Sequence, residues 1–302
     1  MIVFLTTRAH GYTHAPLVGC AGGPDVQVVP YDDFLARART PPATHVFTDL
    51  DRLSIPDTRL AARRFRALRA QGVRVLNDPA RVHSRYGLLR ALYRAGLNRF
   101  DAHRVENADV PSRWPVFVRF EGTHEAPVSG LLADAAALDA AVRAAVDGGA
   151  PVTALLVIEY AAEPVRPGLW RKLSVFRVGD ASVAHTCVHD DNWLVKHGKA
   201  GIATPELYAD ELRIVREDPY GAALAPVFDL AGIDYGRADF AFVGGGIQTY
   251  EINSNPAISF PTEHPSPFRL EAYALFRAAY LAALHAIDTP AGGDDVDLTL
   301  GA

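Results

Sequence analysis

The sequence has few of the features that mark secreted, membrane-spanning or nucleic-acid-binding chains. It contains only two cysteines, Cys20 and Cys187, which exclude a disulfide framework and favour a reducing cytoplasm as the location. Its formal net charge of −5 excludes a global basic field of the kind that holds nucleic acid, and it leaves a local basic cleft open. No apolar run reaches the length that crosses a bilayer, and Arg8 and His10 interrupt the first run too early for a signal peptide. We therefore expect a cytoplasmic protein with neither a nucleic-acid nor a membrane partner.

The composition is instead that of a globular enzyme. Hydrophobic residues make up 49% and charged residues 22% of the 302 residues, which is ordinary for a folded domain. A chain of this length can bury a large core and commonly divides into two or three lobes. No internal repeat is visible. The oligomeric state is left open, with a homodimer as one alternative.

Residues 1–77 predict a small parallel α/β domain, because short apolar strands alternate with helices. The predicted strands are 2–6, 26–30, 44–48 and 73–76. The predicted helices are 31–38 and 59–71, the second of which is closed by Gly72.

The rest of the chain predicts two α+β lobes, 78–160 and 161–288. The first is expected to contain a helix over 84–95, a strand over 115–120, a helix over 135–146 and a strand over 154–160. The second is expected to contain a hairpin of 170–178 with 182–188, a helix over 220–231, a hairpin over 236–253 and a helix over 268–287. The remaining segment, 289–302, is rich in glycine, proline and aspartate, and we expect it to be disordered.

The hairpin over 236–253 carries the most informative residues. If Gly244–Gly246 form a three-residue loop, Asp239 lies directly opposite Glu251 and Arg237 lies directly opposite Asn253. Side chains alternate along a strand, so these four point from one face. The other face is expected to pack on the core, and it carries Phe240, Phe242, Tyr250 and Ile252.

Two carboxylates that face each other repel unless a cation lies between them. Magnesium takes oxygen ligands in proteins, commonly one or two carboxylates completed by phosphates and water. Asp239, Glu251 and the amide oxygen of Asn253 fit that demand, and Arg237 adds a charge suited to stabilising phosphate. The alternative is a solvated hairpin whose acids and arginine form a surface salt bridge.

This hairpin resembles that of the ATP-grasp superfamily, which includes carboxylate–amine ligases such as D-alanine–D-alanine ligase. Arg237-Ala-Asp239 is similar to the Arg-x-Asp strand of that family, and Glu251-Ile-Asn253-Ser-Asn-Pro256 is similar to its Glu-x-Asn-x-x-Pro strand end. The resemblance extends more weakly over residues 75–285. It implies an ATP-grasp fold, in which an N-terminal α/β domain precedes two α+β lobes that enclose ATP. It also implies that Asp239, Glu251 and Asn253 hold Mg²⁺, which Mn²⁺ could replace, with Arg237 at the transferring phosphate or acyl oxygen.

The resemblance further implies which residues bind the phosphates. Arg85 and Arg119 occupy positions where the family places phosphate-binding lysines, and arginine can clamp phosphate oxygens through its planar fork. Arg85 is equally compatible with a solvated helix charge. The loop 121–130 lies where the family folds a flexible loop over the phosphates. Lys172 lies on a strand that leads into the cleft, and Lys196 corresponds to a lysine that reaches the γ-phosphate, although basic residues in strands are usually solvated.

The nucleotide base is expected near residues 154–161. The resemblance implies that Glu159 lies near the adenine amino group and that the backbone at Tyr160 and Ala161 bonds the ring. Glu159 could equally be the solvent-facing end of an apolar strand.

A second combination of residues suggests a different metal. His185, Cys187 and His189 alternate on one predicted strand and are ligand types that zinc prefers. Residues that alternate along one strand span too far to converge on one ion, and no fourth ligand is evident. A structural or substrate-pocket role is therefore favoured over zinc.

Taken together, the resemblance implies an ATP-dependent ligase that phosphorylates a small carboxylate and joins it to an amine. A phosphotransferase that acts on a small hydroxyl or acid, and a non-catalytic nucleotide-binding module, remain as alternatives. The N-terminal lobe and residues 255–268 are expected to shape the acceptor pocket, and the sequence does not identify either substrate.

Overall fold

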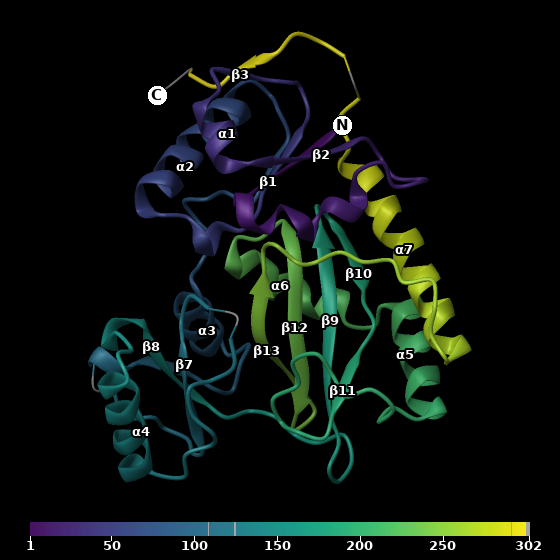
Figure 1. Cartoon of the computed structure of the whole chain (residues 1–302). Coiled ribbons are helices and arrows are strands. Elements are labelled where there is room, and N and C mark those ends of the chain that lie inside the picture. The colour runs from purple at the N-terminus through teal and green to yellow at the C-terminus, as the bar shows by residue number, and fades with distance from the viewer. Residues whose placement is uncertain (108, 124, 291, 300–302) are drawn as a thin grey trace.

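The computed structural model describes residues 1–107, 109–123, 125–290 and 292–299. Its main sheets lie in three places: a parallel sheet at the top of Figure 1, a small antiparallel sheet at the lower left, and a larger antiparallel sheet at the lower right. This combination of parallel α/β and antiparallel α+β parts confirms the fold class that the sequence predicts. Among the described residues, no helix is both long and apolar enough to span a bilayer.

The N-terminal sheet has four parallel strands in the order β2-β1-β4-β5. They are β1 (Ile2–Thr6), β2 (Val26–Pro30), β4 (Thr44–Phe47) and β5 (Val75–Leu76), flanked by helices α1 (Tyr31–Ala36) and α2 (Ile55–Ala70). Helix α2 begins earlier than predicted because the Ser54 side chain caps it by accepting a hydrogen bond from the Asp57 N–H. Strand β1 has β2 as its neighbour along one edge and β4 as its neighbour along the other, so the order of the strands reverses at β1. The carboxyl ends of β1 and β4 therefore border the crevice where ligands bind in sheets of this kind.

The small lobe is a three-stranded antiparallel sheet in the order β6-β8-β7. Its strands are β6 (Ala102–Arg104), β7 (Val116–Phe120) and β8 (Leu155–Glu159), and helix α4 (Ala135–Asp147) packs against β7. Helix α3 (Arg85–Arg94) precedes this lobe and contacts both β6 and the large lobe.

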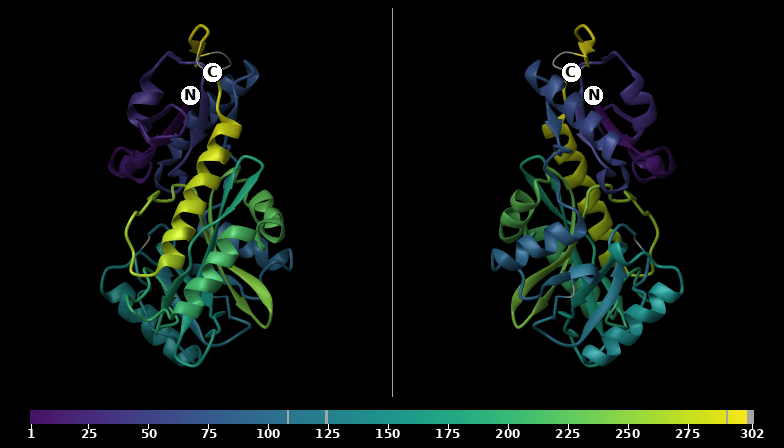
Figure 2. Two further views of the ribbon diagram at one scale, coloured as in Figure 1. Left: turned by 90° about the vertical axis from the view of Figure 1, so that its right-hand side faces the viewer. Right: turned by 90° about the vertical axis from the view of Figure 1, so that its left-hand side faces the viewer.

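The large lobe is an antiparallel sheet in the order β10-β9-β12-β13, with β11 beside the start of β9. Its strands are β9 (Trp170–Val178), β10 (Ala181–Ala184), β11 (Val188–Asp190), β12 (Tyr235–Val243) and β13 (Gly246–Asn253). Its helices are α5 (Pro205–Glu217), α6 (Gly221–Ala231) and α7 (Pro267–Ile287), and Figure 2 shows α5 and α7 side by side along the sheet. The predicted single strand over 182–188 is wrong, because the chain leaves the edge of β9 after Ala184 and returns as β11 at the other end of that strand. Helix α5 was not predicted.

The register of the β12–β13 hairpin at Asp239 and Glu251 is as predicted, although its turn is not. Asp239 pairs with Glu251 and Arg237 pairs with Asn253. The turn has two residues, Gly244 and Gly245, both with positive φ, instead of the predicted three. A bulge beside Asp239 adds one residue to β13 and offsets the shorter turn.

The C-terminal segment contradicts the prediction of disorder over 289–302. Strand β14 (Val296–Asp297) pairs with β3 (Arg39–Thr40), and the Leu298 side chain is buried in the N-terminal core. Residues 291 and 300–302 lie outside the described residues.

Candidate functional site

Two cavities lie between the lobes, and one set of charged residues lines both. We call them the aromatic pocket and the polar cavity. The residues that line both are Arg85, Lys172, Lys196, Asp239 and Glu251. Every site residue predicted from the sequence lines one of the two cavities. The aromatic pocket also receives Arg119, Glu159, Tyr160 and Ala161, and the polar cavity receives Arg237 and Asn253.

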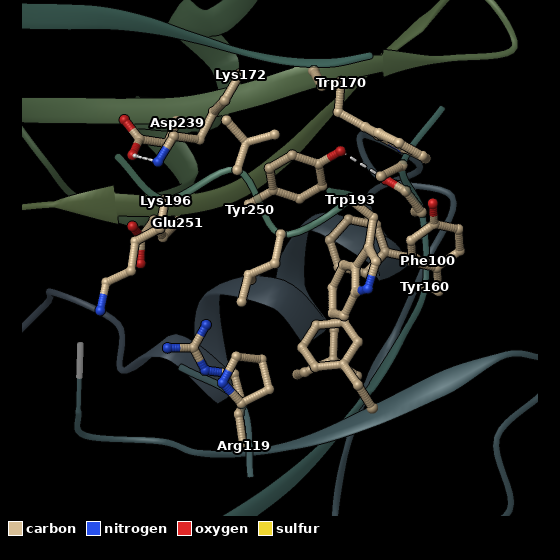
Figure 3. A pocket seen from close by; sticks show the side chains of 18 of the residues that line it. Phe100, Arg119, Tyr160, Trp170, Lys172, Trp193, Lys196, Asp239, Tyr250 and Glu251 are labelled. Atoms are coloured by element: carbon tan, nitrogen blue, oxygen red, sulfur yellow. Dashed lines mark hydrogen bonds and ion pairs between the residues drawn. The ribbon is translucent and has the colours of Figure 1, made fainter. Parts of the chain in front are cut away.

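The aromatic pocket is enclosed by rings from both lobes. Figure 3 shows Phe100, Tyr160, Trp170 and Trp193 at one end, with Lys172, Asp239 and Glu251 at the other. The Trp193 ring packs against Phe117 at 5.1 Å and edge-on against Tyr160 at 5.6 Å between centroids. The empty volume is about 1090 Å³, which includes space that is open to solvent. Flat apolar walls that end in charged groups suit a ligand with a planar ring and an anionic tail.

The hinge between the lobes offers the backbone groups for such a ring. The Tyr160 N–H donates to the Pro115 carbonyl at 2.9 Å, and the Ala161 carbonyl accepts from the Tyr250 hydroxyl at 2.8 Å. The remaining groups at these two positions are the Tyr160 carbonyl and the Ala161 N–H, for which no partner appears among the described residues. These two groups belong to one trans peptide unit and point in opposite directions, so one of them can face the amino group or a ring nitrogen of adenine in the pocket.

Tyr250 reaches the hinge because of the β-bulge. The expectation that it shares a packing face with Phe240, Phe242 and Ile252 is wrong. Those three residues belong to the core beneath α3 and α6, whereas Tyr250 packs with the core around Phe100 and lines the aromatic pocket. The extra residue in β13 turns its side chain toward the small lobe.

Glu159 is buried and bound by the small lobe itself. Its carboxylate accepts hydrogen bonds from the Ser112 N–H at 2.8 Å, the Ser112 hydroxyl at 2.9 Å and the Asp101 N–H at 3.0 Å, and it contacts His103 at 3.3 Å. Burial alone would raise the pKa of Glu159, but the hydrogen bonds from His103 and Ser112 outweigh it and lower the pKa to about 2. These contacts favour a structural role for the carboxylate over a contact with adenine.

Asp239 is fully buried and surrounded by donors. Arg237 donates to both of its oxygens at 2.8 and 3.2 Å, Lys172 lies at 3.1 Å, and the Ser174 hydroxyl donates at 2.9 Å. Burial favours the neutral acid, but the charges of Arg237 and Lys172 outweigh it and lower the pKa of Asp239. This carboxylate is therefore ionised at neutral pH.

Glu251 faces Asp239 and has its own cation. Arg85 donates to one Glu251 oxygen at 2.9 Å, and the Asn253 side-chain nitrogen lies 3.5 Å from the other. Burial and the charge of Asp239 both raise the pKa of Glu251, yet the cations Arg85 and Lys172 bring it below its ordinary value. Protein cations thus balance the two opposed carboxylates.

The oxygen atoms at this site fit a magnesium ion. Asp239, Glu251 and Asn253 lie together at the end of the hairpin and offer two carboxylates and an amide oxygen, which are hard donors of the kind magnesium takes. Within the described residues, no group of three or more histidine, cysteine, aspartate or glutamate residues is arranged to hold a metal ion. An ion here would need further oxygen ligands from water or phosphate.

Arg85 and Arg119 converge on the start of the loop that follows β7. Arg85 donates to the carbonyls of Glu121 at 2.5 Å and Thr123 at 2.9 Å, and Arg119 donates to the Thr123 carbonyl at 3.2 Å. Burial and the neighbouring charge of Arg85 lower the pKa of Arg119 to about 10, so it remains a cation at neutral pH. Two half-buried cations that share the Thr123 carbonyl form a candidate site for an anion. His124, in the same predicted loop, lies outside the described residues.

The polar cavity lies on the other side of the acid pair, toward the N-terminal sheet. Its lining combines His10 and Arg52 from that sheet with His185, Arg237 and Asn253 from the large lobe. Burial lowers the pKa of His185 to about 3, so its ring is neutral.

The three candidate zinc ligands do not form a site. His185 packs edge-on against Phe276 at 4.5 Å and lines the polar cavity, whereas the Cys187 N–H donates to buried Glu211 at 2.7 Å. His189 is buried opposite Arg171 in the β9–β11 ladder and lines neither cavity. The preference for structural or pocket roles agrees with these positions.

Sequence reasoning missed the aromatic walls, and it expected the N-terminal lobe to shape the acceptor pocket without naming the residues that line the polar cavity. Trp193 lies three residues before Lys196, so its place in the same loop was a usable signal. Phe100 and Phe117 resemble ordinary core residues in the sequence. His10 and Arg52 belong to loops after β1 and β4, and only the order of the strands brings those loops together.

Comparison with solved structures finds chains that share this architecture. The VanG D-Ala:D-Ser ligase from Enterococcus faecalis aligns over 95% of this chain and 98% of its own, with a TM-score of 0.51 and 12% identity. The ATP-grasp ligase PsnB, complexed with a minimal precursor, aligns over 93% and 99%, with a TM-score of 0.51 and 15% identity. The D-alanine–D-alanine ligase from Bacillus anthracis aligns over 95% and 99%, with a TM-score of 0.50 and 10% identity. Neither the protein-family models nor the curated proteins contain a match. At these identities the likeness concerns the fold, and it shows that this chain has the ATP-grasp fold.

Proposed function

We propose that this protein is an ATP- and magnesium-dependent ligase that joins a small carboxylate to an amine through an acyl phosphate. The observation that carries the proposal is the common border of the two cavities. A pocket suited to a planar ring and a polar cavity meet at Arg85, Lys172, Lys196, Asp239 and Glu251. A phosphoryl group that leaves a nucleotide in the first space would pass across this border to a substrate in the second.

The residues on the nucleotide side would bind and orient ATP. The backbone at Tyr160 and Ala161 would bond the adenine edge through one group of its shared peptide, the Tyr160 carbonyl or the Ala161 N–H. Trp193 would cover the face of the ring. Arg85, Arg119, Lys172 and Lys196 would contact phosphate oxygens. Positioning and electrostatic stabilisation are the main contributions that a protein makes to phosphoryl transfer.

The residues on the acceptor side would hold the carboxylate that is phosphorylated. Arg237 lines the polar cavity, where its charge can stabilise the acyl phosphate while its nitrogens bond Asp239. Magnesium held by Asp239, Glu251 and Asn253 would supply Lewis-acid neutralisation of the phosphate oxygens. When the ion is bound, Arg85 and Lys172 would release the carboxylates and become available to phosphate.

A hydroxylamine trap tests this proposal. The purified protein would be incubated with ATP, Mg²⁺, hydroxylamine and pools of D- and L-amino acids or dicarboxylates. Acyl hydroxamate together with ADP is the expected result, because hydroxylamine captures an acyl phosphate. A phosphorylated hydroxyl product without hydroxamate would show a phosphotransferase instead. ATP binding without any turnover would show that the protein is a non-catalytic nucleotide-binding module.

A further inference from the structure

A histidine of the N-terminal domain is held at the edge of the polar cavity by two neighbouring loops. His10 and Thr7 follow β1, and Asp49 follows β4. The His10 Nδ1 atom lies 2.7 Å from the Thr7 hydroxyl and 3.4 Å from a carboxylate oxygen of Asp49. The His10 side chain is 28% exposed, whereas that of Asp49 is fully buried. The group therefore has a buried acid behind an accessible imidazole.

The hydrogen bonds determine which nitrogen of His10 carries the proton. The Thr7 hydroxyl donates its single proton to Asp49, which also accepts from the Thr7 N–H at 3.1 Å and from Arg52. The Thr7 oxygen can then only accept from His10, so Nδ1 carries the hydrogen of the neutral ring. The lone pair lies on Nε2, for which no partner appears among the described residues. The ring is thus oriented as a proton acceptor.

The position of His10 places it on the acceptor side of the acid pair. It lines the polar cavity together with Arg237, Asn253 and Glu251. It also lies at the carboxyl ends of β1 and β4, the crevice where parallel sheets bind ligands. The backbone of Asp49 has positive φ, a conformation that aspartate tolerates better than most residues and that turns the chain under His10.

We propose that His10 is the general base that deprotonates the incoming amine, with Thr7 and Asp49 as positioning residues. This role rests on the proposed ligase function. The acceptor ammonium would give one proton to Nε2, and its nitrogen would then attack the carbonyl carbon of the acyl phosphate. As the C–N bond forms, the C–O bond to phosphate breaks, the phosphate leaves with the electron pair and it takes the second nitrogen-bound proton. Asp49 would stabilise the imidazolium that results.

Two acceptors that differ in basicity separate this role from a structural one. Hydroxylamine is largely unprotonated at neutral pH and needs no base. Glycinamide is more basic, so it is largely protonated in the same neutral buffer and must lose a proton before it can attack. Wild type, His10→Gln, Asp49→Asn and the exposed α7 control His285→Gln would be assayed with ATP, Mg²⁺ and the D- and L-amino acid pools. We expect His10→Gln to keep hydroxamate formation within a few fold and to lose about 10²-fold or more in amide formation with glycinamide. His285→Gln should match wild type with both acceptors. The amide formation of Asp49→Asn should lie between that of wild type and that of His10→Gln. The backbone at this position should be kept in Asp49→Asn, because asparagine also tolerates positive φ.

Each outcome separates the proposals. Equal loss of both products in His10→Gln, or no loss of amide, overturns the role of His10. Absence of hydroxamate in the wild type overturns the proposed ligase function itself. The tautomer is testable without any substrate, by ¹⁵N NMR of the histidine rings with His10→Gln for assignment. A hydrogen on Nε2 of neutral His10, or an unchanged signal in Thr7→Val, contradicts the positioning by Thr7 and Asp49.

Discussion

Arg119 offers the most direct test of the phosphate site. It is half-buried next to another cation, Arg85, and its described hydrogen bonds go to the carbonyls of Phe120 and Thr123 at 3.3 and 3.2 Å. These bonds are long, and neither acceptor carries a formal charge. A phosphate would therefore replace weak contacts with charge-assisted ones and would separate two like charges.

The magnitude follows from this arrangement. A hydrogen bond to a charged group contributes about 1.5–3 kcal/mol, which corresponds to roughly 10- to 150-fold in Kd. We expect Arg119→Ala to weaken binding of a non-hydrolysable ATP analogue with Mg²⁺ by that factor in isothermal titration. Arg119→Lys should retain much of the affinity, because lysine still supplies the charge without the planar fork.

The stability of the free protein provides a second readout. Removal of Arg119 relieves its repulsion with Arg85 and breaks no ion pair. The Tm of Arg119→Ala without nucleotide should therefore not fall on that account. The increase in Tm on adding the analogue should be smaller than in wild type. Arg143→Ala, at an exposed position on α4, is the matched control and should behave as wild type. Unchanged affinity in Arg119→Ala would place Arg119 outside the phosphate site and refute the reasoning.

Four further predictions follow from the site. Glu251→Gln should abolish ATP turnover with an unchanged circular dichroism spectrum, and normal turnover would remove Glu251 from the metal site. Arg237→Met should keep ATP affinity within a few fold and cut turnover by about 10²–10³, as loss of one preorganised donor does; equal losses would make it a ground-state phosphate clamp. Tyr250→Phe removes the 2.8 Å bond to the Ala161 carbonyl and should lower unfolding free energy by about 0.5–1.5 kcal/mol in urea titration, so an unchanged midpoint would contradict that bond. Folding lowers the pKa of Glu159 from 4.5 to about 2. The ionised carboxylate therefore contributes its full stabilisation of the folded state at pH values above the pKa of the unfolded chain. This stabilisation is lost as the pH falls through the pKa of the folded protein. Glu159→Gln should therefore be less stable at neutral pH and should lose less stability than wild type on acidification, and identical pH profiles would argue against the Glu159 hydrogen bonds.

Local sequence patterns determined most of the secondary structure and the opposed pair of carboxylates. Alternation along two strands joined by glycines was enough to place Asp239 opposite Glu251. That placement was right although the turn was wrong, because a shorter turn and a bulge changed the register by one residue in opposite directions. Nothing in the residues around Thr249 marks such a bulge, and its consequence, the turning of Tyr250 to the hinge, was therefore missed.

Contacts between distant segments were decided by the tertiary structure alone. His10 and Asp49 lie thirty-nine positions apart, and their contact depends on β1 and β4 being neighbours in the sheet. Two of the cations that neutralise the opposed carboxylates, Arg85 and Lys172, come from α3 and β9, which no local period relates to the hairpin. The pairing of β14 with β3 could not be predicted from composition either, because the composition of the tail is typical of a disordered segment. Periodicity and turn chemistry act over a few residues, so the sequence by itself determined the elements and the pair of acids. The packing of three sheets determined which cations, rings and histidine surround them, because those interactions form only when distant segments are buried together.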